Sequence, residues 1–124
     1  MTESRNNIVV VDYDTEMTKA LKTLLAAAGL HALSFESAEA LLQADAARRA
    51  ACLVLEICLP GLSGFELQKR LIQNGVRRPT IFITAYADPD SQARAERAGA
   101  IAFFTKPFSG PDLIAAVTKA LATE

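Results

Sequence analysis

The chain has 124 residues, of which 51% are hydrophobic, and its 13 basic and 14 acidic side chains give a formal net charge of −1. A chain of this size is expected to fold as one domain, residues 1–124, whose core needs neither disulfides nor a structural metal. The small net charge disfavours nucleic acid and anionic membranes as partners of this domain. No stretch approaches the roughly 20 apolar residues of a membrane span, and the start of the chain is too polar for a signal peptide. We therefore expect a cytoplasmic protein without membrane contact.

Strand-like runs of β-forming residues alternate along the chain with helix-like patterns. The predicted strands cover residues 8–11, 31–35, 53–55, 80–84 and 102–105. The predicted helices start at the capping residues Asp14, Ser37, Ser63, Asp88 and Ser109. Each connection is long enough for a right-handed crossover, so the alternation predicts an α/β fold: a doubly wound, five-stranded parallel sheet with five helices.

Three of these elements have distinctive compositions. Residues 53–55 form an unbroken apolar run, which is typical of a central strand covered on both faces, and Glu56 follows it directly. Residues 31–35 form a weaker strand, which we place at an edge of the sheet. The helix that starts at Asp88 has no large apolar side chain over residues 91–98, so we expect it to be weakly held and able to move.

Polar side chains lie at the ends of four predicted strands. Asp12 follows the first strand, Glu56 the third and Lys106 the fifth, while Thr84 ends the fourth. The carboxyl ends of parallel strands share one edge, where open α/β sheets place their ligands and chemistry. A lysine at the end of an apolar strand is expected to point at a negative group, and the candidates for Lys106 are Glu56 and Asp12.

Four segments, taken in order, resemble the receiver domains of bacterial two-component response regulators, the CheY-like superfamily, and are closest to the subgroup that precedes helix-turn-helix output domains. The segments are residues 9–12, 53–64, 81–85 and 99–108. The resemblance implies a flavodoxin-like sheet with the strand order 2-1-3-4-5. It also implies a signalling module of a phosphorelay rather than an enzyme.

The resemblance further implies an acceptor site at the carboxyl edge. In this family an aspartate at the end of the third strand accepts a phosphoryl group, and an acidic pair with a main-chain carbonyl holds Mg²⁺ against it. Glu56 matches the phosphoacceptor position. The matches to the metal ligands are Asp12, Glu56 and the main-chain carbonyl of Cys58.

A second group of positions matches residues that respond to phosphorylation in the family. Thr84 and Lys106 match the hydroxyl and the lysine that bind the phosphoryl group, and Phe103 matches the aromatic residue that swings with them. The bond from Lys106 to Pro107 matches a peptide bond that is cis in the family, and proline makes the cis form accessible.

Two positions depart from the family pattern. Glu56 stands where the family has the phosphoacceptor aspartate, and Tyr13 stands where it has the second metal-binding acid. The extra methylene displaces the nucleophile, and a misplacement of about 1 Å can cost about a hundredfold in rate. A phenol is a poor substitute for a carboxylate on a hard cation. We therefore expect no cofactor, weak or absent Mg²⁺ binding, and signalling that does not depend on phosphorylation.

The expected output is binding to another protein. The family's partner surface comprises the fourth helix, the fifth strand and the fifth helix. In this chain the fourth helix supplies Gln92, Arg94, Glu96 and Arg97, so a partner would meet a polar surface. The partners implied are a sensor kinase, an effector domain or a second receiver, including a homodimer.

Several alternatives stay open from the sequence. Glu56 has three possible roles. It is still phosphorylated with the help of Mg²⁺, it forms an ion pair with Lys106, or it reaches towards Lys106 and Thr84 and mimics the phosphoryl group. Flavin binding by a protein of the same fold is another possible function. The loop after the first strand argues against it, because it is acidic where a phosphate cradle needs hydroxyls and main-chain amides. A redox role for Cys58 and a plugging role for Tyr86 are further options.

Overall fold

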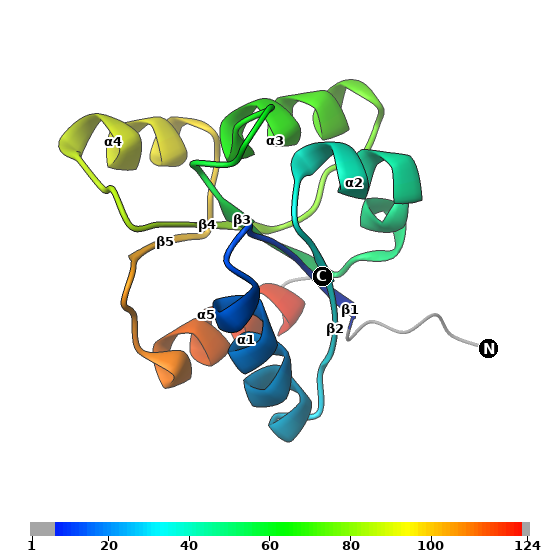
Figure 1. The fold of residues 1–124 in the computed structure, drawn as a ribbon, viewed down its shortest axis with the longest axis vertical. Helices are drawn as coiled ribbons and strands as arrows, with labels where there is room; N and C mark the ends of the chain where they lie inside the picture. Colours follow the sequence, from blue (N-terminus) through cyan, green and yellow to red (C-terminus); the bar gives the residue numbers. More distant parts are fainter. Residues whose placement is uncertain (1–6, 123–124) are drawn as a thin grey trace.

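The computed structural model describes residues 7–122, which form one sheet and two layers of helices (Figure 1). The strands are β1 (Asn7–Val11), β2 (His31–Phe35), β3 (Cys52–Glu56), β4 (Thr80–Thr84) and β5 (Ala102–Thr105). The helices are α1 (Thr15–Ala27), α2 (Ala38–Ala44), α3 (Gly64–Gln73), α4 (Pro89–Arg97) and α5 (Gly110–Ala122), with a short 3₁₀ helix η1 (Ala46–Arg49) after α2. Within the described residues no helix is long and apolar enough to cross a membrane.

The sheet has the predicted topology. Its five strands are parallel and lie in the order β2-β1-β3-β4-β5, so β2 is at an edge as expected. Figure 1 shows α2, α3 and α4 on one face of the sheet and α1 and α5 on the other. This arrangement confirms the doubly wound, flavodoxin-like fold. The 3₁₀ helix η1 was not predicted as a separate element.

Alternate residues of the central strands supply two separate cores, one on each face of the sheet. The core under α2, α3 and α4 takes its strand residues from Val9, Val11, Leu53, Leu55 and Phe82. The core under α1 and α5 takes its strand residues from Ile8, Val10, Val54, Ile81 and Ile83. Because both faces are covered, every residue of β3 and β4 is buried, as expected for central parallel strands.

The helix starts are fixed by the predicted caps. Side-chain oxygens at these caps accept hydrogen bonds from main-chain N–H groups three residues later, and the caps are Asp14, Ser37, Ser63, Asp88 and Ser109. At α3 the cap is reciprocal, because the Glu66 carboxylate also accepts from the Ser63 N–H at 2.8 Å. Such caps satisfy N–H groups that a helix leaves unpaired at its start.

Helix α4 packs on α3 through polar and small side chains. Ala95 is its single buried residue among those described. The Arg94 guanidinium lies 4.5 Å from the centre of the Phe65 ring in α3, which is cation–π geometry. Gln68 in α3 donates through Nε2 to the main-chain oxygen of Ala98, at 3.2 Å. The predicted lack of a large apolar anchor in α4 is confirmed.

Candidate functional site

The carboxyl edge of the sheet brings together three charged side chains from three strands. Asp12 follows β1, Glu56 is the last residue of β3, and Lys106 follows β5. In the sheet, β4 lies between β3 and β5. The main-chain N–H of Lys106 donates to the Thr84 oxygen at 2.8 Å, which continues the ladder between β4 and β5 past the end of the strand. This hydrogen bond fixes the position of the main chain at Lys106.

The Lys106 ammonium contacts both carboxylates. Its Nζ lies 2.7 Å from Asp12 Oδ2 and 2.8 Å from Glu56 Oε1. Both carboxylate side chains are nearly inaccessible to solvent, whereas the Lys106 side chain is 17% exposed. The expectation that Lys106 points at Glu56 or Asp12 is confirmed, and it meets both at once.

The second oxygen of each carboxylate accepts a main-chain hydrogen bond. Glu56 Oε2 accepts from the N–H of Cys58 at 2.9 Å, and Asp12 Oδ1 accepts from the N–H of Asp14 at 2.9 Å. Each carboxylate therefore has one oxygen on the ammonium and one on the backbone. Asp14 itself caps α1, the role that the sequence favoured for it.

Burial and charge act in opposite directions on these groups. Burial raises the pKa of Asp12 above its ordinary value, and it outweighs the hydrogen bonds from Lys106 and Asp14, which act to lower that pKa. Burial acts to lower the pKa of Lys106, but the combined hydrogen bonds and charges of Asp12 and Glu56 outweigh burial and raise it. The lysine is thus held in its charged form.

Thr84, the last residue of β4, and Cys58 lie next to each other at one side of the site. Thr84 is fully buried, and its Oγ1 accepts a hydrogen bond from the N–H of Tyr86 at 3.1 Å. The Cys58 sulfur, which is exposed, lies 3.8 Å from the same Oγ1. Among the described residues Thr84 has no hydrogen bond to Glu56, whose two oxygens go to Lys106 and Cys58. Tyr86 is 76% exposed, so its ring is not buried in the site.

Tyr13 directly follows Asp12 but is 65% exposed to solvent. Over residues 7–122 there is no group of three or more His, Cys, Asp and Glu side chains placed to hold a metal ion. Asp12 and Glu56 are the two acidic side chains at the centre of the site, and both are paired with Lys106.

The remaining predicted positions lie beside the site on β5. Phe103 is partly buried against the core under α2, α3 and α4, while Phe104 packs on the opposite core and against Phe108. This is the alternation expected along a strand. The bond between Lys106 and Pro107 is cis.

Two residues that shape the site were not singled out from the sequence. Gly64 lies so close to the main-chain oxygen of Glu56 that a Cβ there would overlap it. Glu39 in α2 accepts a hydrogen bond from the Leu62 N–H at 3.0 Å, which holds the loop between β3 and α3. The two glycines in residues 61–64 were the feature of the sequence that could have indicated Gly64. Nothing in the local sequence pointed to Glu39.

Comparison with known proteins places this geometry in a family. The protein-family model of the response regulator receiver domain matches residues 8–118 of this chain. Response regulator protein TmoT of Ectopseudomonas mendocina is 37% identical over 121 residues, which are 98% of this chain and 55% of the relative. Nodulation protein W of Bradyrhizobium diazoefficiens is 38% identical over 113 residues, 91% of this chain and 50% of the relative. The chain spans about half the length of these curated relatives.

Solved structures agree with this assignment. The chain is similar to response regulator StyR, with a TM-score of 0.86 and 37% identity over 94% of this chain and 59% of that one. It is also similar to a response regulator receiver protein from Burkholderia phymatum, with a TM-score of 0.81 and 35% identity over 94% of both chains.

Proposed function

The chain belongs to the response regulator receiver domains of two-component signalling, and from this premise we propose that it is an atypical receiver, which signals by binding a protein rather than by phosphorylation of Glu56. The observation that carries the proposal is the contact of Lys106 Nζ with both Asp12 and Glu56, at 2.7 and 2.8 Å. This ammonium already contacts both carboxylates and offsets part of their negative charge.

The arrangement of Glu56 is unfavourable for a nucleophile. One carboxylate oxygen pairs with Lys106 and the other accepts from the Cys58 N–H, and both contacts draw electron density from the oxygens and so weaken them as nucleophiles. The side chain is also one methylene longer than the aspartate of the family. Since a misplacement of about 1 Å can cost about a hundredfold in rate, both features argue against efficient phosphoryl transfer to this residue.

The donor set is also a poor fit for Mg²⁺. This cation prefers carboxylate oxygens in a near-octahedral arrangement. To bind here, Mg²⁺ would have to displace Lys106 from Asp12 and Glu56. Tyr13, which follows Asp12, offers an exposed phenol instead of a carboxylate. We therefore propose that Mg²⁺ binds weakly or not at all, and that the domain needs no cofactor.

Between the two metal-free roles of Glu56, the ion pair has the better support. Glu56 contacts Lys106, but it does not reach Thr84, whose hydroxyl accepts from Tyr86 instead. A phosphoryl mimic would need both contacts. We propose that the charged site holds one fixed conformation, so that binding and not a phosphorylation switch is the output.

The proposed binding surface is formed by α4, β5 and α5. Its solvent-facing residues on α4 include Gln92, Arg94, Glu96 and Arg97, and Ile101, between α4 and β5, is 46% exposed. The polar residues of this surface suit a partner with charged groups at its own surface. A sensor kinase, an effector domain or a second receiver fits this description.

The proposal is tested by exposing the protein to acetyl phosphate and MgCl₂ and measuring its intact mass. We expect no added phosphoryl group. The matched control is the double variant Glu56→Asp, Tyr13→Asp, which restores both acids and should gain one phosphoryl group under the same conditions. A stable phosphoryl group on Glu56 of the unaltered protein would instead establish the alternative, a receiver that still works in a Mg²⁺-dependent phosphorelay.

A further inference from the structure

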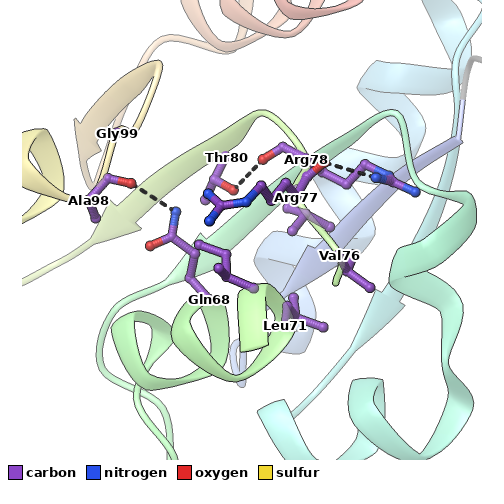
Figure 2. A pocket seen from close by; sticks show the side chains of 10 residues that line it. Gln68, Leu71, Val76, Arg77, Arg78, Thr80, Ala98 and Gly99 are labelled. Carbon is purple, nitrogen blue, oxygen red and sulfur yellow. Dashed lines mark hydrogen bonds between the residues drawn. The ribbon is translucent and has the colours of Figure 1, made fainter. Parts of the chain in front are cut away.

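A crevice of about 190 Å³ lies at the amino edge of the sheet, opposite the edge that carries Glu56 (Figure 2). It is bounded by α3, the loop that leads into β4, and the end of α4. Its floor is apolar and buried, with Leu53, Leu71 and Val76 each no more than 5% exposed. The acceptor site and the proposed partner surface leave this crevice without a role.

Two adjacent arginines at the crevice have different environments. Arg78 is engaged, because its guanidinium donates to the main-chain oxygens of Arg77 and Arg48. The Arg77 guanidinium has no hydrogen bond or ion pair within the part of the chain that the structure describes. In Figure 2 its side chain extends across the crevice towards Thr80 and Gln68. Arg77 is exposed to solvent, so this cation lies at the open side of the crevice and has no internal counter-charge among the described residues.

The surroundings of Arg77 favour an anion. Arg48 and Arg49 of η1 lie at the same edge of the sheet and add positive charge there. Among the described acids, Asp45 pairs with Arg48, at 3.3 Å. Gln68 Nε2 donates to the Ala98 oxygen at 3.2 Å. An amide nitrogen carries two hydrogens, so Gln68 retains one more donor for a ligand in the crevice.

The size of the crevice limits what can fill it. A cavity of roughly 150 Å³ with apolar walls holds a benzene molecule. This crevice is slightly larger and has a guanidinium at one side, so it suits an apolar body of about one ring with a single carboxylate. Inorganic phosphate would satisfy Arg77 but would leave the apolar floor uncovered.

We propose that this crevice is a binding site for a small organic monocarboxylate, whose carboxylate pairs with Arg77 and whose apolar body lies on Leu53, Leu71 and Val76. Guanidinium groups bind carboxylates through paired hydrogen bonds. The ligand would contact α3, the start of β4 and the residues Ala98 and Gly99 that follow α4. It would therefore hold the end of a helix that has no large apolar anchor of its own.

Benzoate is the probe for this site, followed by amide shifts in two-dimensional NMR of the ¹⁵N-labelled protein. We expect benzoate to shift Gln68, Arg77, Ala98 and Gly99, while benzamide, which has the same shape and no charge, gives much weaker binding. Arg77→Gln should raise the dissociation constant of benzoate about tenfold, as expected for loss of one charge-assisted hydrogen-bonding pair. Arg49→Gln is the matched control, because it removes the same charge from the same edge outside the crevice, and it should change the constant little.

Three results would overturn the proposal. The first is equal weakening by Arg77→Gln and Arg49→Gln, which would mean that only the general charge of the edge matters. The second is equal binding of benzoate and benzamide. The third is a set of shifts that sodium chloride at the same ionic strength reproduces, or that lies at other residues. None of these outcomes bears on phosphorylation of Glu56, so this site and the proposed signalling role fail independently.

Discussion

Lys106 and Glu56 form an ion pair of 2.8 Å across the end of β4, the strand that lies between their own strands in the sheet. The same ammonium lies 2.7 Å from Asp12 on the far side of β3. One lysine therefore links the ends of β1, β3 and β5. In this chain the cation that contacts the two carboxylates is covalently part of the protein.

Removing the ammonium should destabilise the fold. Lys106→Met would leave two buried carboxylates without their partner, and breaking a buried ion pair from one side costs about 3 kcal/mol or more. Unfolding in urea, followed by circular dichroism, measures the loss. Lys119→Met is the control, since Lys119 is exposed on α5. A loss no larger for Lys106→Met than for this control would show that the ion pairs contribute little.

The contribution of Lys106 should vanish at high pH. Its folded pKa is raised above the ordinary 10.5, because Asp12 and Glu56 together outweigh its burial. The stabilisation is therefore complete below pH 10.5 and declines as the pH rises through the folded pKa. The difference in unfolding free energy between the wild type and Lys106→Met should shrink in that range. A difference that stays constant would contradict the assigned charge state.

Asp12 should likewise make the fold less stable as the pH rises, but in the acid range. Its folded pKa is raised by burial above the ordinary 3.8, so between these two values the folded state binds more protons than the unfolded state. Its contribution to stability is then lost as the pH rises through that window. The unfolding free energy of Asp12→Asn, minus that of the wild type, should therefore increase with pH across the acid range. A decrease would mean that Lys106 dominates over burial at this carboxyl.

The two departures from the family should act together on metal binding. Glu56→Asp shortens the nucleophile and weakens its reach to Lys106, while Tyr13→Asp adds a carboxylate ligand. We expect that only the double variant binds Mg²⁺ and beryllofluoride well, at least about tenfold more tightly than either single variant, since Mg²⁺ demands a complete oxygen set. Calorimetric titration measures this. Equal affinity in the unaltered protein would refute our account of Tyr13.

The sequence was sufficient for most of the fold and for the meeting of charged groups. Apolar runs bounded by caps at Asp14, Ser63 and Asp88 located the elements, because local hydrogen bonds and hydrophobic periodicity set them. The parallel topology then placed Asp12, Glu56 and Lys106 at one edge.

What the sequence could not supply was the choice among contacts within that edge. Whether Glu56 would reach Lys106, Thr84 or both depends on its side-chain rotamer and on the Cys58 N–H, which takes its second oxygen. The packing of Arg94 on Phe65 depends in the same way on how α3 and α4 approach each other. Tertiary distances of this kind leave no periodic signal in the chain.

The attachment of α4 provides the last prediction. Arg94 lies over the Phe65 ring, and Arg97, on the same helix, is exposed and has no ion pair or hydrogen bond among the described side chains. A cation–π contact at the surface is worth about 0.5–1 kcal/mol, which corresponds to a two- to fivefold change in an opening equilibrium. Arg94→Ala should therefore accelerate amide hydrogen exchange in α4 by about that factor, with little change in global stability. Arg97→Ala is the control, because it makes the same change in charge and helix propensity without touching Phe65. Equal exchange rates in the two variants would mean that Ala95 and the Gln68 hydrogen bond hold the helix without help from Arg94.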